Sequence, residues 1–161
     1  MNIAYCQYCG ETVVKKDATE YQCSNGHLTW NNPHAAVSVI LYQNGKILYS
    51  IRGIEPHKGK IDLPGGFLNF NEQPFEGAAR EIVEETSLEV KELEPIGAFT
   101  HMYYDNVSVT DFLFLCRKWG GTPTARDDVQ ELVWKPIDTI NSQEFAWQYP
   151  GLTDTLKEKL L

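Results

Sequence analysis

A strong β-hairpin signal within residues 35–52 constrains the fold of this chain most. The apolar run 35–42 is typical of a buried strand, Asn44-Gly45 favours a tight turn, and residues 46–52 read as the returning strand. Further strands are expected around Val90–His101, Val107–Cys116 and Val129–Lys135. A glycine- and proline-bearing loop is expected from Gly53 to about Gln73.

Two other segments carry helical periodicity. Pro74 suits the first position of a helix that runs to about Thr86, and Leu152, Leu156 and Leu160 mark one face of a C-terminal helix. The apolar positions expected to face the core from the first helix are Phe75, Ala78, Ala79, Ile82 and Val83. Strands with a few helices predict an α/β domain with a mixed sheet.

The cysteines of the N-terminal segment predict a metal site. Cys6-x2-Cys9 followed by Cys23-x3-His27 has the ligand spacing of a structural zinc site. Four protein ligands complete a tetrahedron, so this zinc is expected to be structural and not catalytic. His27 is the weakest ligand of the set, and His34 or water are alternatives for the fourth position. The competing interpretation is a group of ordinary reduced cysteines beside a surface histidine.

The segment 66–88 is unusually acidic. On a helix, Glu81, Glu84 and Glu85 stand at i, i+3 and i+4 and project from one face. The segment contains five acids and only one base, so a cluster neutralised by divalent cations is the favoured explanation. Hard oxygen ligands favour Mg²⁺ or Mn²⁺. A solvated acidic face is the alternative, but the preceding Gly65-Gly66 allows backbone groups to approach an ion or a phosphate closely.

The overall charge excludes some classes of partner. The chain has 161 residues and a formal net charge of −8, which argues against binding to nucleic acids or to anionic membranes. Residues 66–88 carry half of that charge, so ions bound there would still permit a small diphosphate ligand. The sequence shows no signal peptide and no run of 18 apolar residues, and with its clustered cysteines we expect a cytoplasmic protein.

The acidic segment resembles the Nudix box, Gly-x5-Glu-x7-Arg-Glu-U-x-Glu-Glu-x-Gly-U, where U is aliphatic. The positions in register are Gly66, Glu72, Arg80, Glu81, Ile82, Glu84, Glu85 and Leu88. The one departure is Ser87, which replaces a glycine that usually ends the helix in a left-handed conformation. Residues 52–67 are similar to the approach loop of many Nudix hydrolases, and residues 128–134 to their later acidic strand.

The resemblance implies a Nudix α/β/α sandwich over residues 34–161, preceded by a zinc ribbon over residues 1–33. It implies Mg²⁺- or Mn²⁺-dependent hydrolysis of a nucleoside diphosphate derivative with release of a nucleoside monophosphate. The zinc-ribbon group includes NADH pyrophosphatases, but residues 97–104 lack the Ser-Gln-Pro-Trp-type array of those enzymes. ADP-ribose or a related dinucleotide or nucleotide sugar is therefore the expected substrate, and family members often form homodimers. A catalytically silent nucleotide-sensing or interaction module is the alternative.

The resemblance also implies roles for single residues. The expected metal ligands are Glu81, Glu84, Glu85 and the carbonyl of Gly65. Arg80 and Glu72 would orient these glutamates. The base that activates water is either a glutamate of the box or one of Asp128 and Glu131.

Two residues outside the box are candidates for substrate binding. The guanidinium fork of Arg52 suits a phosphate, with a surface ion pair as the alternative. Tyr103 could stack on a nucleobase, with ordinary packing as the alternative.

Overall fold

The computed structural model describes residues 3–105, 107–139, 141–147, 149 and 151–160. In chain order the elements are β1 (Val13–Lys15), β2 (Glu20–Cys23), β3 (Leu28–Trp30), β4 (His34–Gln43), β5 (Lys46–Arg52), β6 (Ile61–Asp62), β7 (Gly65–Phe67), α1 (Pro74–Thr86), β8 (Glu89–Val90), β9 (Glu94–Tyr104), β10 (Val107–Cys116), β11 (Trp119–Gly120), β12 (Val129–Pro136), the short 3-10 helices Ile137–Thr139 and Ser142–Glu144, and α2 (Leu152–Leu160).

The central sheet is mixed, as the sequence predicts. Its strand order is β12-β5-β4-β10-β9, with β6 paired to β5 and β7 paired to β4. β10 runs parallel to β4, whereas the other pairs in this sheet are antiparallel. The hairpin turn at Asn44-Gly45 joins β4 to β5, and both of its residues have positive φ. The predicted α/β class is therefore confirmed.

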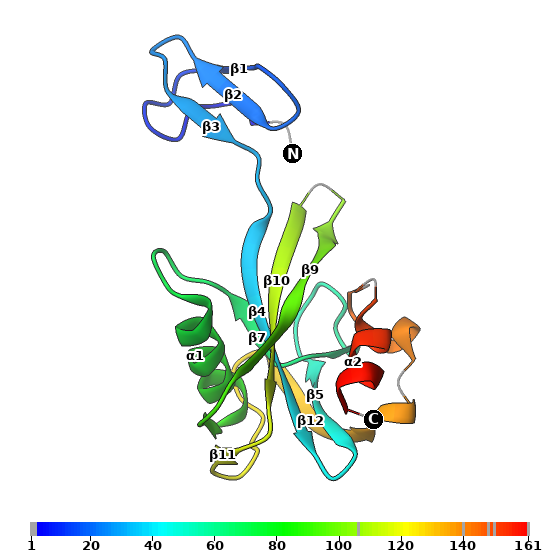
Figure 1. Ribbon diagram of the computed structural model, residues 1–161. Helices are drawn as coiled ribbons and strands as arrows, with labels where there is room; N and C mark the ends of the chain where they lie inside the picture. The colour runs from blue at the N-terminus through cyan, green and yellow to red at the C-terminus, as the bar shows by residue number, and fades with distance from the viewer. Residues whose placement is uncertain (1–2, 106, 140, 148, 150, 161) are drawn as a thin grey trace.

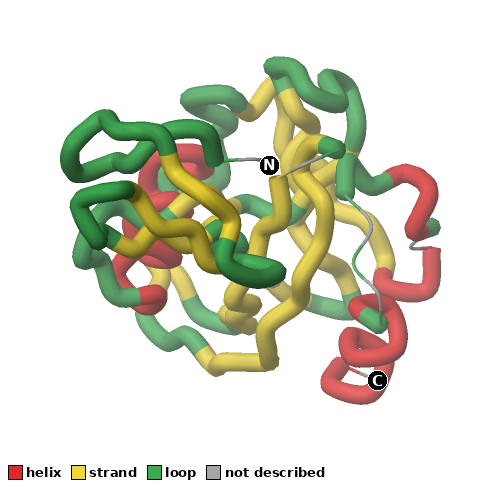
Figure 2. The backbone as a smooth tube through the Cα atoms, turned by 90° about the horizontal axis from the view of Figure 1, so that it is seen from above, coloured by secondary structure: helices red, strands yellow, loops and turns green. Residues whose placement is uncertain are grey.

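Helices cover both faces of this sheet, as Figures 1 and 2 show in two views. On one face, Ala78 and Ile82 of α1 pack against Val37, Val39 and neighbouring residues of the sheet. On the other face, the C-terminal segment contributes Phe145, Leu152 and Leu156 to a core with Ile40, Leu113 and others. Both β4 and β10 contribute side chains to each core, because successive side chains along a strand point to opposite faces of the sheet.

Two sequence expectations need correction. The expected strand 90–101 is divided, because β8 pairs with β11 in a small separate sheet and β9 pairs with β10. The expected loop 53–73 contains the short strands β6 and β7, which extend the central sheet. Length explains the second error, since strands of two or three residues leave no periodicity to read.

The buried face of α1 also differs from the expectation. Ala78 and Ile82 are fully buried, but Phe75 and Val83 are about half exposed at 50% and 47%. Ala79 is half-buried. The helix turns two acids inward instead, because Glu81 and Glu85 belong to its buried residues together with Gly77 and Thr86.

The N-terminal residues form a small antiparallel sheet of β1, β2 and β3 that stands beyond the end of the central sheet (Figure 1). Its buried side chains are few and include Cys6, Tyr21 and Cys23. The division into residues 1–33 and 34–161 remains a prediction. Among the described residues, no helix is long and apolar enough to cross a membrane.

Candidate functional site

The helix α1 is fixed at both ends by local contacts. At its start, Gln73 and Glu76 form a reciprocal capping box and Pro74 occupies the first turn. At its end, Ser87 adopts the left-handed conformation with φ 61° and its amide donates to the Val83 carbonyl at 3.1 Å. Serine therefore takes the conformation expected of the glycine that it replaces.

The loop before β12 completes the end of α1. The amide of Thr124 donates to the carbonyl of Thr86 at 2.8 Å, and the amide of Arg126 donates to the carbonyl of Glu85 at 2.9 Å. These bonds satisfy the terminal carbonyls of the helix. They also hold the following Asp128 close enough to Glu85 for its charge to raise the pKa of that carboxyl.

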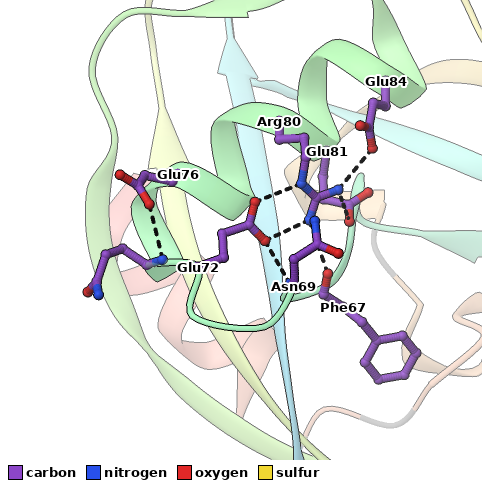
Figure 3. Close-up of polar contacts among 8 residues, drawn as sticks. Phe67, Asn69, Glu72, Glu76, Arg80, Glu81 and Glu84 are labelled. Atoms are coloured by element: carbon purple, nitrogen blue, oxygen red, sulfur yellow. Dashed lines mark hydrogen bonds and ion pairs between the residues drawn. The ribbon is translucent and has the colours of Figure 1, made fainter.

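Arg80 is the centre of the acidic cluster (Figure 3). Its Nε and Nη2 donate to the two carboxylate oxygens of Glu72 at 2.7 and 2.9 Å, a bidentate pair. Its Nη1 donates to Glu81 at 2.8 Å and to Glu84 at 2.9 Å, and Nη2 also reaches the carbonyl of Phe67 at 3.1 Å. One guanidinium thus holds three of the predicted acids in place.

Glu85 contacts the glycine pair before the helix. Its Oε2 accepts a hydrogen bond from the Gly65 amide at 2.9 Å. A Cβ added to Gly65 would collide with the Val37 carbonyl, and one added to Gly66 would lie 2.6 Å from the Glu81 carboxylate. At Gly65 a side chain would clash with the backbone of β4, and at Gly66 it would displace the Glu81 carboxylate, so glycine lets β7 pass close to both.

Burial and charge perturb the acids of this cluster in different directions. Burial raises the pKa of Glu85 well above its ordinary value, and the nearby Asp128, Asp62 and Glu81 raise it further. Burial also raises the pKa of Glu81, although the hydrogen bond from Arg80 opposes that shift. The same guanidinium lowers the pKa of Glu72 to about 2. Glu81 is thus partly compensated by Arg80, whereas Glu85 forms no ion pair within the described part of the chain, and an additional cation would supply the missing positive charge.

The predicted substrate-binding residues Arg52 and Tyr103 lie together against Trp147. Nη1 of Arg52 pairs with Asp62 at 3.3 Å, and its Nε donates to the Pro56 carbonyl at 2.8 Å. Tyr103 stacks on Trp147 with a centroid distance of 4.4 Å, and the Arg52 guanidinium lies 5.3 Å from the centroid of the same ring. In this structure the alternatives hold for both residues, because Arg52 forms an ion pair with Asp62 and Tyr103 packs on Trp147.

Sequence reasoning missed Trp147 and Asp62. The indole Nε1 of Trp147 donates to Asp62 at 2.9 Å, although 85 positions separate them in the chain. The aromatic cluster Phe145, Trp147 and Tyr149 was the available signal for the first. For Asp62, the signal was a carboxylate between the apolar residues Ile61 and Leu63.

The family model of the NUDIX domain matches residues 32–156 of this chain. The chain belongs to the NUDIX family. A curated relative from Methanocaldococcus jannaschii, an ADP-ribose pyrophosphatase, is 31% identical over 146 residues, which cover 90% of this chain and 83% of the relative. The predicted Nudix fold and the predicted enzyme class, a Nudix pyrophosphohydrolase, are confirmed at this level.

Solved Nudix structures show the same fold. A Nudix hydrolase from Nitrosomonas europaea superposes with a TM-score of 0.71 at 26% identity, covering 96% of this chain and 89% of that one. The NUDIX domain of Shewanella oneidensis NrtR, solved in complex with ADP ribose, gives a TM-score of 0.68 at 18% identity, covering 82% of this chain and 91% of that one.

The N-terminal cysteines gather around one point in this Nudix protein. The ligand atoms of Cys6, Cys9, Cys23 and His27 all lie within 4.8 Å of one another. The Sγ atoms of Cys9 and Cys23 are 3.8 Å apart, and Nδ1 of His27 lies 3.7 Å from Cys6 and 3.6 Å from Cys23. With zinc–sulfur bonds of about 2.3 Å, a tetrahedron has edges of roughly 3.7 Å. The donor set and its spacing therefore fit zinc.

Hydrogen bonding prepares one of these thiols for metal binding. The backbone amide of Glu11 and the side chain of Asn25 are the main causes that lower the pKa of Cys9 to about 6. His34, the alternative fourth ligand, lies instead in β4 with its ring against Phe67.

Two carboxyls outside the Nudix box are buried deeply in the domain. Burial raises the pKa of Asp62 to about 6, against the opposing charge of Arg52. Burial raises the pKa of Asp111 to about 7; the Ser38 hydroxyl opposes that shift and the charge of Asp62 adds to it. Both groups therefore bind a proton more tightly in the folded protein than in the unfolded chain.

We expect the metal-free protein to lose stability as the pH rises from about 4 to about 7. The contribution of Asp111 is fully present below its unfolded pKa of 3.8 and is lost as the pH rises through its folded pKa of about 7, because ionisation is disfavoured in the folded protein. For Asp111, a shift from 3.8 to about 7 corresponds to on the order of 4 kcal/mol at most. Asp111→Asn should flatten this dependence, measured by urea unfolding between pH 4.5 and 7.5 (about the range of the titration). Asp154→Asn, at an exposed position of α2, is the control, and an unchanged slope in Asp111→Asn would contradict the prediction.

Proposed function

We propose that this protein hydrolyses the diphosphate of ADP-ribose or of a related nucleoside diphosphate derivative and releases a nucleoside monophosphate. The observation that carries the proposal is the inward-facing acid pair Glu81 and Glu85 against the glycine pair of β7. The relative from Methanocaldococcus jannaschii supports ADP-ribose as the first substrate to test.

The carboxylates fit a divalent metal by their chemistry. Glu81, Glu84 and Glu85 offer hard oxygen donors, and burial raises the pKa values of Glu81 and Glu85, which a bound cation would offset. We assign these three glutamates, with the carbonyl of Gly65, to holding Mg²⁺ or Mn²⁺. Such ions, when bound, polarise phosphoryl oxygens and lower the pKa of water. Arg80 and Glu72 then act as positioning residues, because their bidentate pair fixes the guanidinium that holds Glu81 and Glu84.

For the base that accepts a proton from the attacking water, Asp128 is a better candidate than Glu131. Asp128 is half-buried and its charge acts on the carboxyl of Glu85. Glu131 is exposed on β12, where it pairs with Ile51 of β5. The acids of the box remain the alternative base. Among them, Glu85 is the one whose pKa the charge of Asp128 raises.

The proposal is tested with a panel of nucleoside diphosphate derivatives, scoring nucleoside monophosphate with and without Mg²⁺. We expect ADP-ribose to be cleaved only with metal. Glu84→Gln should lower kcat by about 10²-fold or more, because it removes one anionic ligand while keeping the shape of the side chain. Glu92→Gln, at an exposed position after the box, is the matched control. Binding of nucleotides without any product would instead support a sensing module.

We further propose that residues 1–33 form a zinc ribbon, with Cys6, Cys9, Cys23 and His27 as ligands of a structural zinc. The tetrahedral spacing of the donor atoms and the lowered pKa of Cys9 support this assignment. The cytoplasmic location, the homodimer and the lack of nucleic-acid or membrane partners stay predictions from the sequence.

A further inference from the structure

A small cavity of about 50 Å³ lies next to the acidic cluster, between the central sheet and the C-terminal segment. Gly66 connects the two places, since it lines the cavity and its Cα faces the Glu81 carboxylate. Tyr103 lines both this cavity and an open groove of about 890 Å³. The cavity therefore adjoins the acids of the box at Gly66 and an open groove at Tyr103.

A buried acid, Asp111, lines the cavity on a face of β10 that is otherwise apolar. Along β10, Leu113 and Leu115 are buried in the core on the α2 side, and Asp111 occupies the preceding position of the same face. Asp111 is only 2% exposed, and its Oδ2 accepts a hydrogen bond from the Ser38 hydroxyl at 2.7 Å. An apolar residue would cost less here, because burying a carboxyl opposes folding.

Two polar atoms in this cavity have no hydrogen-bond partner within the described part of the chain. They are Oδ1 of Asp111 and Nδ1 of His101. Tyr149, which also lines the cavity, lies near enough to the Asp111 carboxyl to lower its pKa, but no hydrogen bond to Oδ1 is formed. The residues are diagonal neighbours on one sheet face, since His101 lies opposite Val109 and Asp111 follows two positions later. Burial lowers the pKa of His101 and so favours its neutral ring, in which one nitrogen donates and the other accepts. Buried atoms without partners are rare in native proteins and call for a ligand or water.

We propose that this cavity receives the polar edge of the substrate's nucleobase, with Asp111 accepting from an exocyclic amino group and His101 bonding the adjacent ring nitrogen. Adenine presents such a donor beside an acceptor on its edge. The volume suits the edge of a ring and not a whole base, so the body of the base lies at the mouth beside Tyr103. The inference rests on the proposed function only in taking a nucleotide as the ligand.

The binding experiment uses the full chain and two matched probes, AMP and the analogue that lacks the 6-amino group. We expect the wild type to bind AMP about 10- to 100-fold more tightly than the analogue, because the amino group donates to a buried carboxyl oxygen that otherwise has no partner. In Asp111→Ala this preference should fall to about threefold or less, since the acceptor is gone. The isosteric Asp111→Asn should lose part of the preference and keeps the test valid if the alanine variant does not fold. Asp154→Ala on α2 is the control that should retain the full preference.

The outcomes separate this inference from the proposed function. If Asp111→Ala and Asp111→Asn both bind the two probes as the wild type does, the cavity holds only water and the inference is overturned, even where ADP-ribose is hydrolysed. If the wild type hydrolyses none of the diphosphates, the proposed function fails, and the preference for AMP still decides the role of the cavity. Equal binding of both probes by the wild type also overturns the inference.

Discussion

Glu85→Gln is expected to lower the Mg²⁺-dependent kcat on the order of 10³-fold while the metal-free protein becomes as stable as the wild type or more so. The loss of activity follows from the proposed role of this carboxylate as a metal ligand. The gain in stability follows from its surroundings, because Glu85 is 6% exposed and lies near the charges of Asp128, Asp62 and Glu81. Glutamine keeps an oxygen for the Gly65 amide and removes the buried charge.

The two effects are measured separately, as kcat with saturating Mg²⁺ and as the melting temperature without metal. Because burial raises the pKa of Glu85, the stability difference should grow as the pH rises above the ordinary value of 4.5. Glu89→Gln, an exposed acid on β8, should leave both quantities unchanged. A variant that keeps more than about a tenth of the activity would exclude Glu85 as an essential metal ligand.

Cys23→Ser is expected to release zinc and unfold the N-terminal sheet while the Nudix domain keeps its fold. Among the described residues before His34, the buried hydrophobic side chains are Cys6, Tyr21 and Cys23. So small a core cannot hold β1, β2 and β3 together without a metal. The two main cores contain none of these side chains, so loss of the ribbon leaves them intact.

Metal analysis of the purified protein should give about one zinc per chain in the wild type and almost none in Cys23→Ser. Amide hydrogen exchange should then rise over residues 13–30 and stay low in β4 and β10. Cys116→Ala is the matched control, because this fourth cysteine is buried in β10 and outside the cluster. Full zinc content in Cys23→Ser would show that the four side chains do not form the site.

Local spacing explains what the sequence predicted well. The bounds of α1 and β10 were predicted at the residues where the structure has them, because Pro74, the turn residues and an apolar run are local signals. The four zinc candidates also meet at one point, since short loops between ligand pairs leave little choice of geometry. The rotation of α1 was predicted wrongly at Phe75 and Val83, because periodicity alone does not reveal that a helix turns carboxylates inward.

The sequence by itself determined the family, the acids of the box and the cysteine cluster, because each depends on residue types at fixed, short separations. Only the tertiary structure decided which acid stands beside Glu85, what Arg52 contacts and that Asp111 meets His101 in a cavity. The physical reason is the same in each case. These contacts join segments far apart in the chain, and their geometry is set by the register of β4, β9 and β10 and by the packing of the helices on the sheet.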